Sequence, residues 1–234
     1  MRCSLLLAGA LATIAASGST LAQVSAPGCG ELTNGYGPYD YRSDRDIMVD
    51  GVPHQRKLWL VEHVHFTPRV EGLISGESGP LGAELDYTLR AFPNHHRALL
   101  SVLRWSEKTN SAQPATLPRK VECYFDRALR FQPDDAIARL LYATFLIKGK
   151  RKPEALAQIE RTRVYAGDNA FTHYNIGLVF LDAGEPEQAL VQAHRAIELG
   201  FERADLKDRL IALGRWQDPA ASAPPSSAAS APPQ

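Results

Sequence analysis

Apolar residues recur at intervals of three and four positions through most of residues 81–217, and this pattern predicts amphipathic helices. Before residue 80 the pattern changes, because Gly, Asn, Tyr and Asp follow one another without a helical period. Helices are expected over 81–92, 95–108, 119–131 and 202–214, and on either side of Gly149 and of Gly184. The pattern therefore predicts an all-α fold preceded by an irregular N-terminal extension.

The helical region repeats itself. Residues 170–197 align with 136–163 at an offset of 34 positions, and small residues coincide where two helices could cross closely. These pairs are Ala143 with Gly177 and Ala155 with Ala189. Residues 86–100 align with 126–140 at an offset of 40, and the six additional residues fit in the polar loop 109–118. We therefore expect three helical hairpins, the first with a longer internal turn.

A 34-residue unit of two helices with this arrangement resembles the tetratricopeptide repeat. Residues 170–203 carry the pattern at Tyr174, Ile176, Gly177, Phe180, Gly184, Ala189 and Ala196. Phe201 stands where the family has Pro, and residues 136–169 have Arg139 in place of a large aromatic residue and Thr162 in place of Ala. The resemblance implies a helical-hairpin repeat over residues 81–217, closed by a capping helix, with a protein or peptide as its partner.

The resemblance also implies a binding surface. In this family the first helices of the hairpins line a concave groove, which here would carry the residues Leu140, Thr144, Ile147, Lys148, Phe171, Tyr174, Asn175 and Leu178. The apolar members would anchor a partner, and Lys148 and Asn175 would make polar contacts. Exposed faces of such repeats also pair with each other, so a homo-oligomer is an alternative assembly.

The two ends of the chain differ from the helical region in composition. Residues 1–22 combine an early Arg, an apolar run and Thr20-Leu21-Ala22, the features of a signal peptide cleaved after Ala22. Residues 218–234 are rich in Pro, Ala and Ser and offer little area to bury, so we expect a disordered tail. Residues 23–80 form the extension. A signal of this kind places the mature chain in the periplasm or outside the cell.

Two cysteines, Cys29 and Cys123, remain when the signal peptide is removed. In an exported chain the simplest interpretation is a disulfide, with free thiols or an intermolecular bond as the alternatives. A bond across 94 positions would hold residues 29–66 against the helices, either inside the groove or outside it.

Two histidine pairs are the candidate metal ligands. His63 and His65 would share one face if residues 56–66 form a strand, and a helix is the alternative. With His95 and His96 they could bind zinc or copper, so a metal-binding periplasmic protein is the alternative function. The spacing matches no specific metal motif, and we expect no cofactor.

His95 and His96 have a second interpretation as the start of a helix. They follow Pro93-Asn94 at the position where Pro133-Asp134 precedes the next repeat. Asn and Asp are preferred N-cap residues, so we expect Asn94 and Asp134 to cap the helices that follow.

Several function classes lack support. The formal net charge is zero, which gives no basic field for nucleic acid. After residue 22 no stretch approaches the ~18 apolar residues of a membrane span. Neither a G-x-S-x-G elbow nor a Gly-rich phosphate loop occurs. We therefore expect a binding module of the bacterial envelope and not an enzyme.

Overall fold

The computed structural model describes residues 28–44, 47–49 and 52–218. The expected signal peptide and residues 219–234 of the expected tail lie outside the described residues. The described chain is all-α apart from one antiparallel hairpin, in which β1 (Ile47–Val49) pairs with β2 (Val52–Gln55). The predicted all-α class is therefore confirmed for the described residues, apart from this hairpin.

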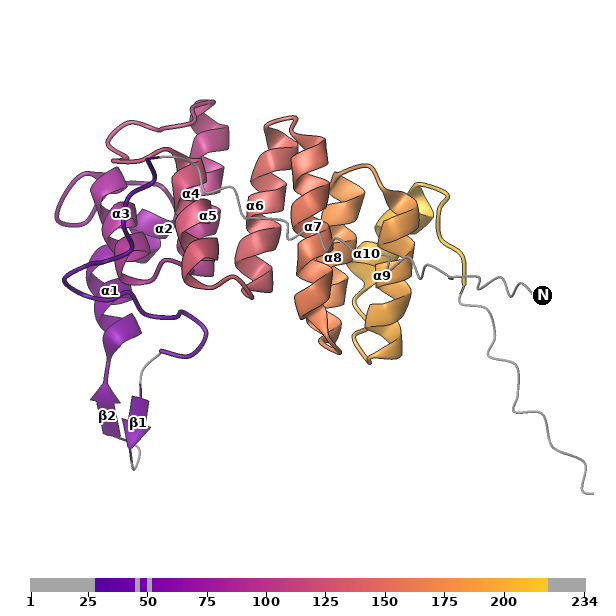
Figure 1. Ribbon diagram of the computed structural model, residues 1–234, viewed down its shortest axis with the longest axis horizontal. Coiled ribbons are helices and arrows are strands. Elements are labelled where there is room, and N and C mark those ends of the chain that lie inside the picture. Colours follow the sequence, from indigo (N-terminus) through magenta and orange to yellow (C-terminus); the bar gives the residue numbers. More distant parts are fainter. Residues whose placement is uncertain (1–27, 45–46, 50–51, 219–234) are drawn as a thin grey trace, which may run out of the picture.

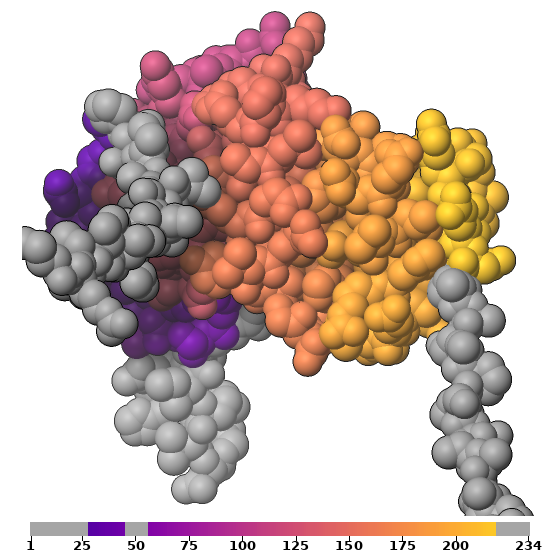
Figure 2. All heavy atoms as spheres, turned by 45° about the vertical axis from the view of Figure 1, so that its right-hand side comes forward, coloured from indigo at the N-terminus to yellow at the C-terminus, as the bar shows by residue number. Residues whose placement is uncertain are grey.

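The helices follow one another in a row (Figure 1). They are α1 (Lys57–His65), α2 (Pro68–Glu71), α3 (Leu81–Ala91), α4 (His96–Thr109), α5 (Val121–Phe131), α6 (Ala136–Lys148), α7 (Lys152–Ala166), α8 (Ala170–Asp182), α9 (Pro186–Glu198) and α10 (Ala204–Ala212). In one layer α4, α6, α8 and α10 contact each other in turn, and in the other α5, α7 and α9 each contact the next helix of the first layer. Drawn as spheres, the helices from α6 to α10 form one continuous body (Figure 2).

The hairpins are α4–α5, α6–α7 and α8–α9, and the second helix of each hairpin buries equivalent positions. The buried triplets of α5, α7 and α9 are Val121, Ala155 and Ala189; Phe125, Ile159 and Ala193; and Ala128, Thr162 and Ala196. Each triplet is spaced by 34 positions. Leu85 of α3 is also buried, 40 positions before Phe125. The offsets of 34 and 40 positions therefore connect equivalent buried residues in α3, α5, α7 and α9. The exposed residues of these helices can be compared at the same offsets.

The first helices begin with one shared arrangement. The N-cap side chain of α4, α6 and α8 accepts a hydrogen bond from the backbone N–H three residues later. The caps are His95, Asp135 and Asn169. The expectation that Asn94 and Asp134 are caps is wrong by one residue. The reason is a turn before each helix, in which the N–H of His95 or Asp135 donates to the carbonyl three residues earlier.

The cores of the two halves of the row are continuous. One apolar cluster joins α6 to α10 and another joins α2 to α6, and both contact Tyr142 and Phe145 of α6. Gly177 of α8 permits the close approach of α10, because a Cβ there would lie 2.5 Å from a methyl group of Leu206. Leu206 and Leu210 are buried, so α10 closes this end of the row.

The N-terminal extension is more regular than its sequence suggests. Residues 57–65 are the helix α1, which packs on α3. It is followed by the short helix α2, which contacts α3 and α4. Among the described residues, no helix combines the length and the apolar character that crossing a membrane requires.

Candidate functional site

Residues 28–44 cross the outer surfaces of α3 and α5 without regular secondary structure. The predicted disulfide is present, since Cys29 bonds to Cys123 of α5 with the two Cα atoms 4.9 Å apart. Arg127 donates to the carbonyl of Glu31, and Arg130 donates to the carbonyl of Gly30 at 2.8 Å. The side chains of α5 therefore hold the backbone of this segment.

The same segment then reaches α3. Arg90 donates to the side-chain carbonyl of Asn34 at 2.9 Å, and the N–H of Tyr39 donates to the carbonyl of Ala91 at 2.8 Å. Asp86 of α3 lies beside these contacts and pairs with Arg90 at 2.8 Å. We call the helix positions that hold this segment, together with Asp86 beside them, the occupied surface. It consists of Asp86, Arg90, Cys123, Arg127 and Arg130.

Beyond Tyr39 the segment joins a buried polar corner between α3, α4 and α6. The amide of Asn94, which is fully buried, donates to Asp40 at 2.7 Å and to Asp135 at 2.8 Å. Its carbonyl accepts from the N–H of Tyr41 at 2.9 Å. Burial opposes the ionisation of Asp40, but hydrogen bonds from Arg42 and Asn94 outweigh it and lower the pKa of that carboxyl. Asn94 thus links the N-terminal segment to two turns of the helical region.

His95 has a structural role in this corner. It is fully buried, its Nδ1 accepts from the N–H of Ala98 at 3.2 Å, and its Nε2 lies 3.0 Å from Glu62. This arrangement places the proton on Nε2. Burial lowers the pKa of His95 below its usual value, although Glu62 acts in the opposite direction. The residue is therefore a neutral N-cap.

The four histidines of the metal hypothesis do not converge. His63 and His65 lie on a helix, where positions two apart point to different sides, so the shared face expected of a strand is absent. His63 stacks on Trp59, His65 lies 2.6 Å from Glu84, and His96 lies 2.9 Å from Asp135. Within the described ranges, no three His, Cys, Asp or Glu side chains are placed to hold a metal ion.

The expected groove residues divide into buried and exposed members. Leu140 and Tyr174 are each 4% exposed, which corrects the expectation that they are open to a partner. Tyr174 is covered by the approach to α10, since its hydroxyl donates to Asp205 at 3.0 Å and its ring packs on Phe201. The other six lie at least partly at the surface: Thr144, Ile147, Lys148, Phe171, Asn175 and Leu178.

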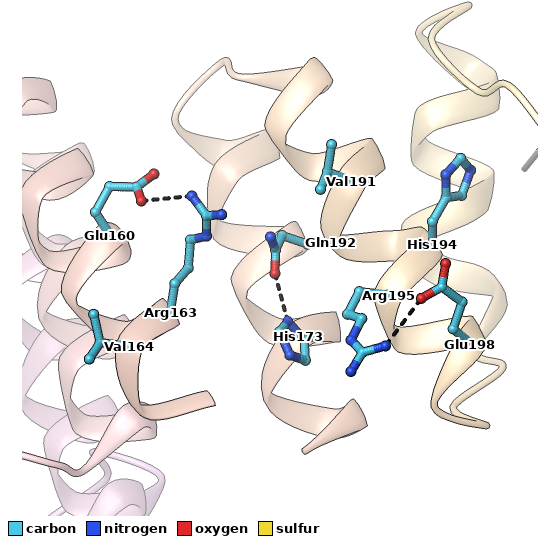
Figure 3. Close-up of a pocket in the computed structure, with 9 residues that line it drawn as sticks. All are labelled: Glu160, Arg163, Val164, His173, Val191, Gln192, His194, Arg195 and Glu198. Carbon is cyan, nitrogen blue, oxygen red and sulfur yellow. Dashed lines mark hydrogen bonds and ion pairs between the residues drawn. The ribbon is translucent and has the colours of Figure 1, made fainter. Parts of the chain in front are cut away.

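A pocket of about 760 Å³ lies between α7 and α9 (Figure 3). We call it the open pocket. It is lined by Glu160, Arg163, Val164, His173, Val191, Gln192, His194, Arg195 and Glu198. Val164 and Val191 are 79% and 59% exposed, although the outer faces of these helices are otherwise mostly polar. The Nδ1 of His173, on α8, lies 2.8 Å from the Oε1 of Gln192, on α9.

The charged side chains of the open pocket pair only at the solvent-exposed surface. Arg163 contacts Glu160 at 2.8 Å, and Arg195 contacts Asp168 at 2.6 Å and Glu198 at 3.3 Å. Exposed pairs of this kind contribute at most about 1 kcal/mol, so they exchange readily for other contacts. The arginines can therefore turn to a new acceptor at little cost.

The open pocket and the occupied surface use equivalent helix positions. Adding 68 to the three α5 positions, or 74 to the two α3 positions, gives residues that line the open pocket. The pairs are Cys123 with Val191, Arg127 with Arg195, Arg130 with Glu198, Arg90 with Val164, and Asp86 with Glu160. This surface was not predicted from the sequence. Exposed valines at the repeat positions of Cys123 and Arg90 were the available signal.

The comparisons with known proteins add no functional assignment. No protein-family model matches the chain, and no curated protein matches it. The geometry of the two equivalent surfaces is therefore the basis for the function proposed below.

Proposed function

We propose that this protein is an exported, non-enzymatic binding module of the tetratricopeptide-repeat class. It holds an irregular or extended segment of a partner protein in the open pocket. The observation that carries the proposal is the equivalence of this pocket with the occupied surface, which already holds such a segment.

The repeat class is supported by two features of the described helices. The first helices contact each other in turn, and each second helix contacts the first helix that follows. The N-caps of α6 and α8 and the buried triplets keep the spacing of 34 positions. Stacks of helical hairpins with this arrangement expose long surfaces that are used for binding.

Export is supported by the bond between Cys29 and Cys123, because disulfides persist in oxidising compartments. The bond holds the N-terminal segment on α5 permanently. Val191 occupies the equivalent position in the open pocket, so a partner there is held without a covalent bond. The pocket is thus suited to reversible binding.

A photo-reactive residue placed at Val191 tests the proposal. In envelope extract of the source cells, it should crosslink to a defined segment of one protein. The same residue at Ile211, which is 52% exposed on α10, should not crosslink to that segment. The crosslinked segment is then synthesised as a peptide and titrated against purified variants.

Three matched variants place the binding surface. Val191→Asp should weaken binding of the peptide about tenfold, which corresponds to about 1.4 kcal/mol. Ile211→Asp should leave it unchanged. Phe171→Asp changes the groove face that the family resemblance implied. A loss of affinity with Phe171→Asp alone would place the partner on α6 and α8, and an absence of crosslinking would contradict the proposal altogether.

A further inference from the structure

The C-terminal end of the described chain runs to the open pocket. After α10, the ring of Trp216 packs edge-on against His194, and Lys207 lies over the same ring. The Nε2 of His194 donates to the carbonyl of Gln217 at 2.8 Å. His194 is itself a lining residue of the open pocket. Gln217, two positions before the sixteen residues 219–234, is therefore held at the rim of this pocket.

The composition of these residues fits the chemistry of the pocket. Residues 219–234 contain five Pro, six Ala, four Ser and one Gln, and no charged side chain. Pro-rich chains favour an extended backbone whose carbonyls are free to accept hydrogen bonds, and Pro has no N–H to satisfy. The small side chains suit a surface with two exposed valines, and the carbonyls suit the guanidinium of Arg195.

The occupied surface provides the pattern for such contacts. There the arginines of α5 donate to the backbone carbonyls of Gly30 and Glu31, and the residue at position 123 faces the segment. At the equivalent positions of α9, Arg195 matches Arg127 and Val191 matches Cys123, whereas Glu198 stands in place of Arg130 and does not donate. A helix of 13 residues such as α9 is about 20 Å long. At about 3.1 Å per residue, seven extended residues span that length.

We propose that residues 219–226 dock in the open pocket as residues 29–36 dock on the occupied surface. The C-terminal tail is then the resident occupant of the pocket, and a partner binds by displacing it. This inference rests on the proposed use of the pocket, but docking of the tail is measured without any partner.

Disulfide trapping in the full-length mature chain tests the docking. Positions 191 and 194 are one helical turn, about 5 Å, apart, and Gln217 is held at His194, so a docked, extended tail passes Val191 within its first few residues, among which Ala221 serves as the probe position. In the double variant Val191→Cys, Ala221→Cys, the two new cysteines should form a bond about tenfold faster than in the control Ile211→Cys, Ala221→Cys. The native Cys29–Cys123 bond stays intact in both.

The control pair would form its bond faster than the test pair if the tail were not docked. Positions 211 and 221 are ten residues apart, whereas positions 191 and 221 are thirty apart, and loop-closure entropy favours the shorter loop. Equal or faster bond formation at position 211 would overturn the inference. Adding Arg195→Glu should slow trapping at position 191 several-fold, while Lys148→Glu, the same change of charge on α6, should not. Equal effects of these two changes would also overturn it.

Removal of residues 219–234 separates this inference from the proposed function. If the tail occupies the pocket, the shortened chain should bind the partner peptide more tightly than the full chain. Trapping without any peptide binding, even to the shortened chain, would refute the proposed function and leave the docking in place. Peptide binding at Val191 without trapping would refute the docking and leave the proposed function in place.

Discussion

The occupied surface and the open pocket use the same five helix positions but have opposite environments. Arg127 is 1% exposed beneath the N-terminal segment, whereas the side chain of Arg195 is 41% exposed. Cys123 bonds covalently to the segment, whereas Val191 contributes only an apolar surface. The comparison shows that the face formed by two successive second helices can hold a chain segment. The covalent attachment of a segment depends on one position, which is Cys123 in α5 and Val191 in α9.

The largest difference in stability between matched changes at the two surfaces should come from removing the disulfide. Replacing Cys29 and Cys123 by Ser should lower the free energy of unfolding by about 4 kcal/mol, because the bond closes a loop of 94 positions. Denaturant unfolding measures the loss, and hydrogen exchange should increase most in residues 30–44. The matched control Val191→Ser, at the equivalent position, should change stability by less than about 0.5 kcal/mol. Equal effects would show that the bond does not distinguish the surfaces.

The next largest effect is expected at the polar corner. Asn94→Ala should cost about 3 kcal/mol, because it removes three buried hydrogen bonds, which join Asn94 to the N–H of Tyr41 and to the carboxylates of Asp40 and Asp135. Asp168 occupies the equivalent position at the corner between α7 and α8, where its side chain is 81% exposed. Asp168→Ala should therefore have little effect on unfolding by denaturant. A small loss for Asn94→Ala would mean that residues 40–42 are not held by this corner.

A moderate, pH-dependent effect should follow from the cap of α4. Burial lowers the pKa of His95, so the unfolded chain binds a proton at a higher pH than the folded chain. The stabilisation by neutral His95 is complete above about pH 6.5 and declines below it by at most about 1.4 kcal/mol per pH unit. His95→Asn supplies a cap that does not titrate, as Asn169 does for α8.

The comparison of His95→Asn with the unchanged chain should isolate this effect. The pKa values of Asp40, Glu62 and Asp135 are lowered, so their contributions are lost only as the pH falls through about 4. The free energy of unfolding is measured with denaturant at several pH values between about 5 and 7.5. Of the four groups, only His95 is expected to change its protonation in this range. Parallel curves for the two chains would contradict a neutral, buried cap.

The smallest effect is expected in the open pocket itself. Arg195→Ala removes only exposed ion pairs, so the free energy of unfolding should change by less than about 0.5 kcal/mol. Arg127→Ala removes a buried side chain that binds the carbonyl of Glu31, and it should destabilise the chain clearly more. If the two changes have the same cost in thermal unfolding, the surfaces do not differ in occupancy.

The sequence predicted the helices well because their apolar periods are long and their corners repeat. The corner at Pro93 and the corner at Pro133 were both found, and so was the bond from Cys29 to Cys123. The caps were misplaced by one residue because Asn94 is the more usual cap by type. It is instead used by Asp40 and Tyr41, contacts that span more than 50 positions.

The route of residues 28–44 could not be predicted, because it depends on such long-range contacts. Arg130 and Gly30 are 100 positions apart, and no local pattern joins them. The burial of Tyr174 likewise results from the later chain, since Phe201 and Asp205 cover it. The family resemblance directed attention to the first helices, whereas the open pocket lies on the second.

The capping helix α10 limits the ways in which copies of this chain can associate. Leu206 and Leu210 are buried against the row, while the outer side presents the exposed charges of Lys207, Asp208 and Arg209 beside the exposed Ile211. A second copy added end to end would have to remove water from these charges, and Ile211 alone offers little apolar area in return. Growth of the row into a filament is therefore disfavoured.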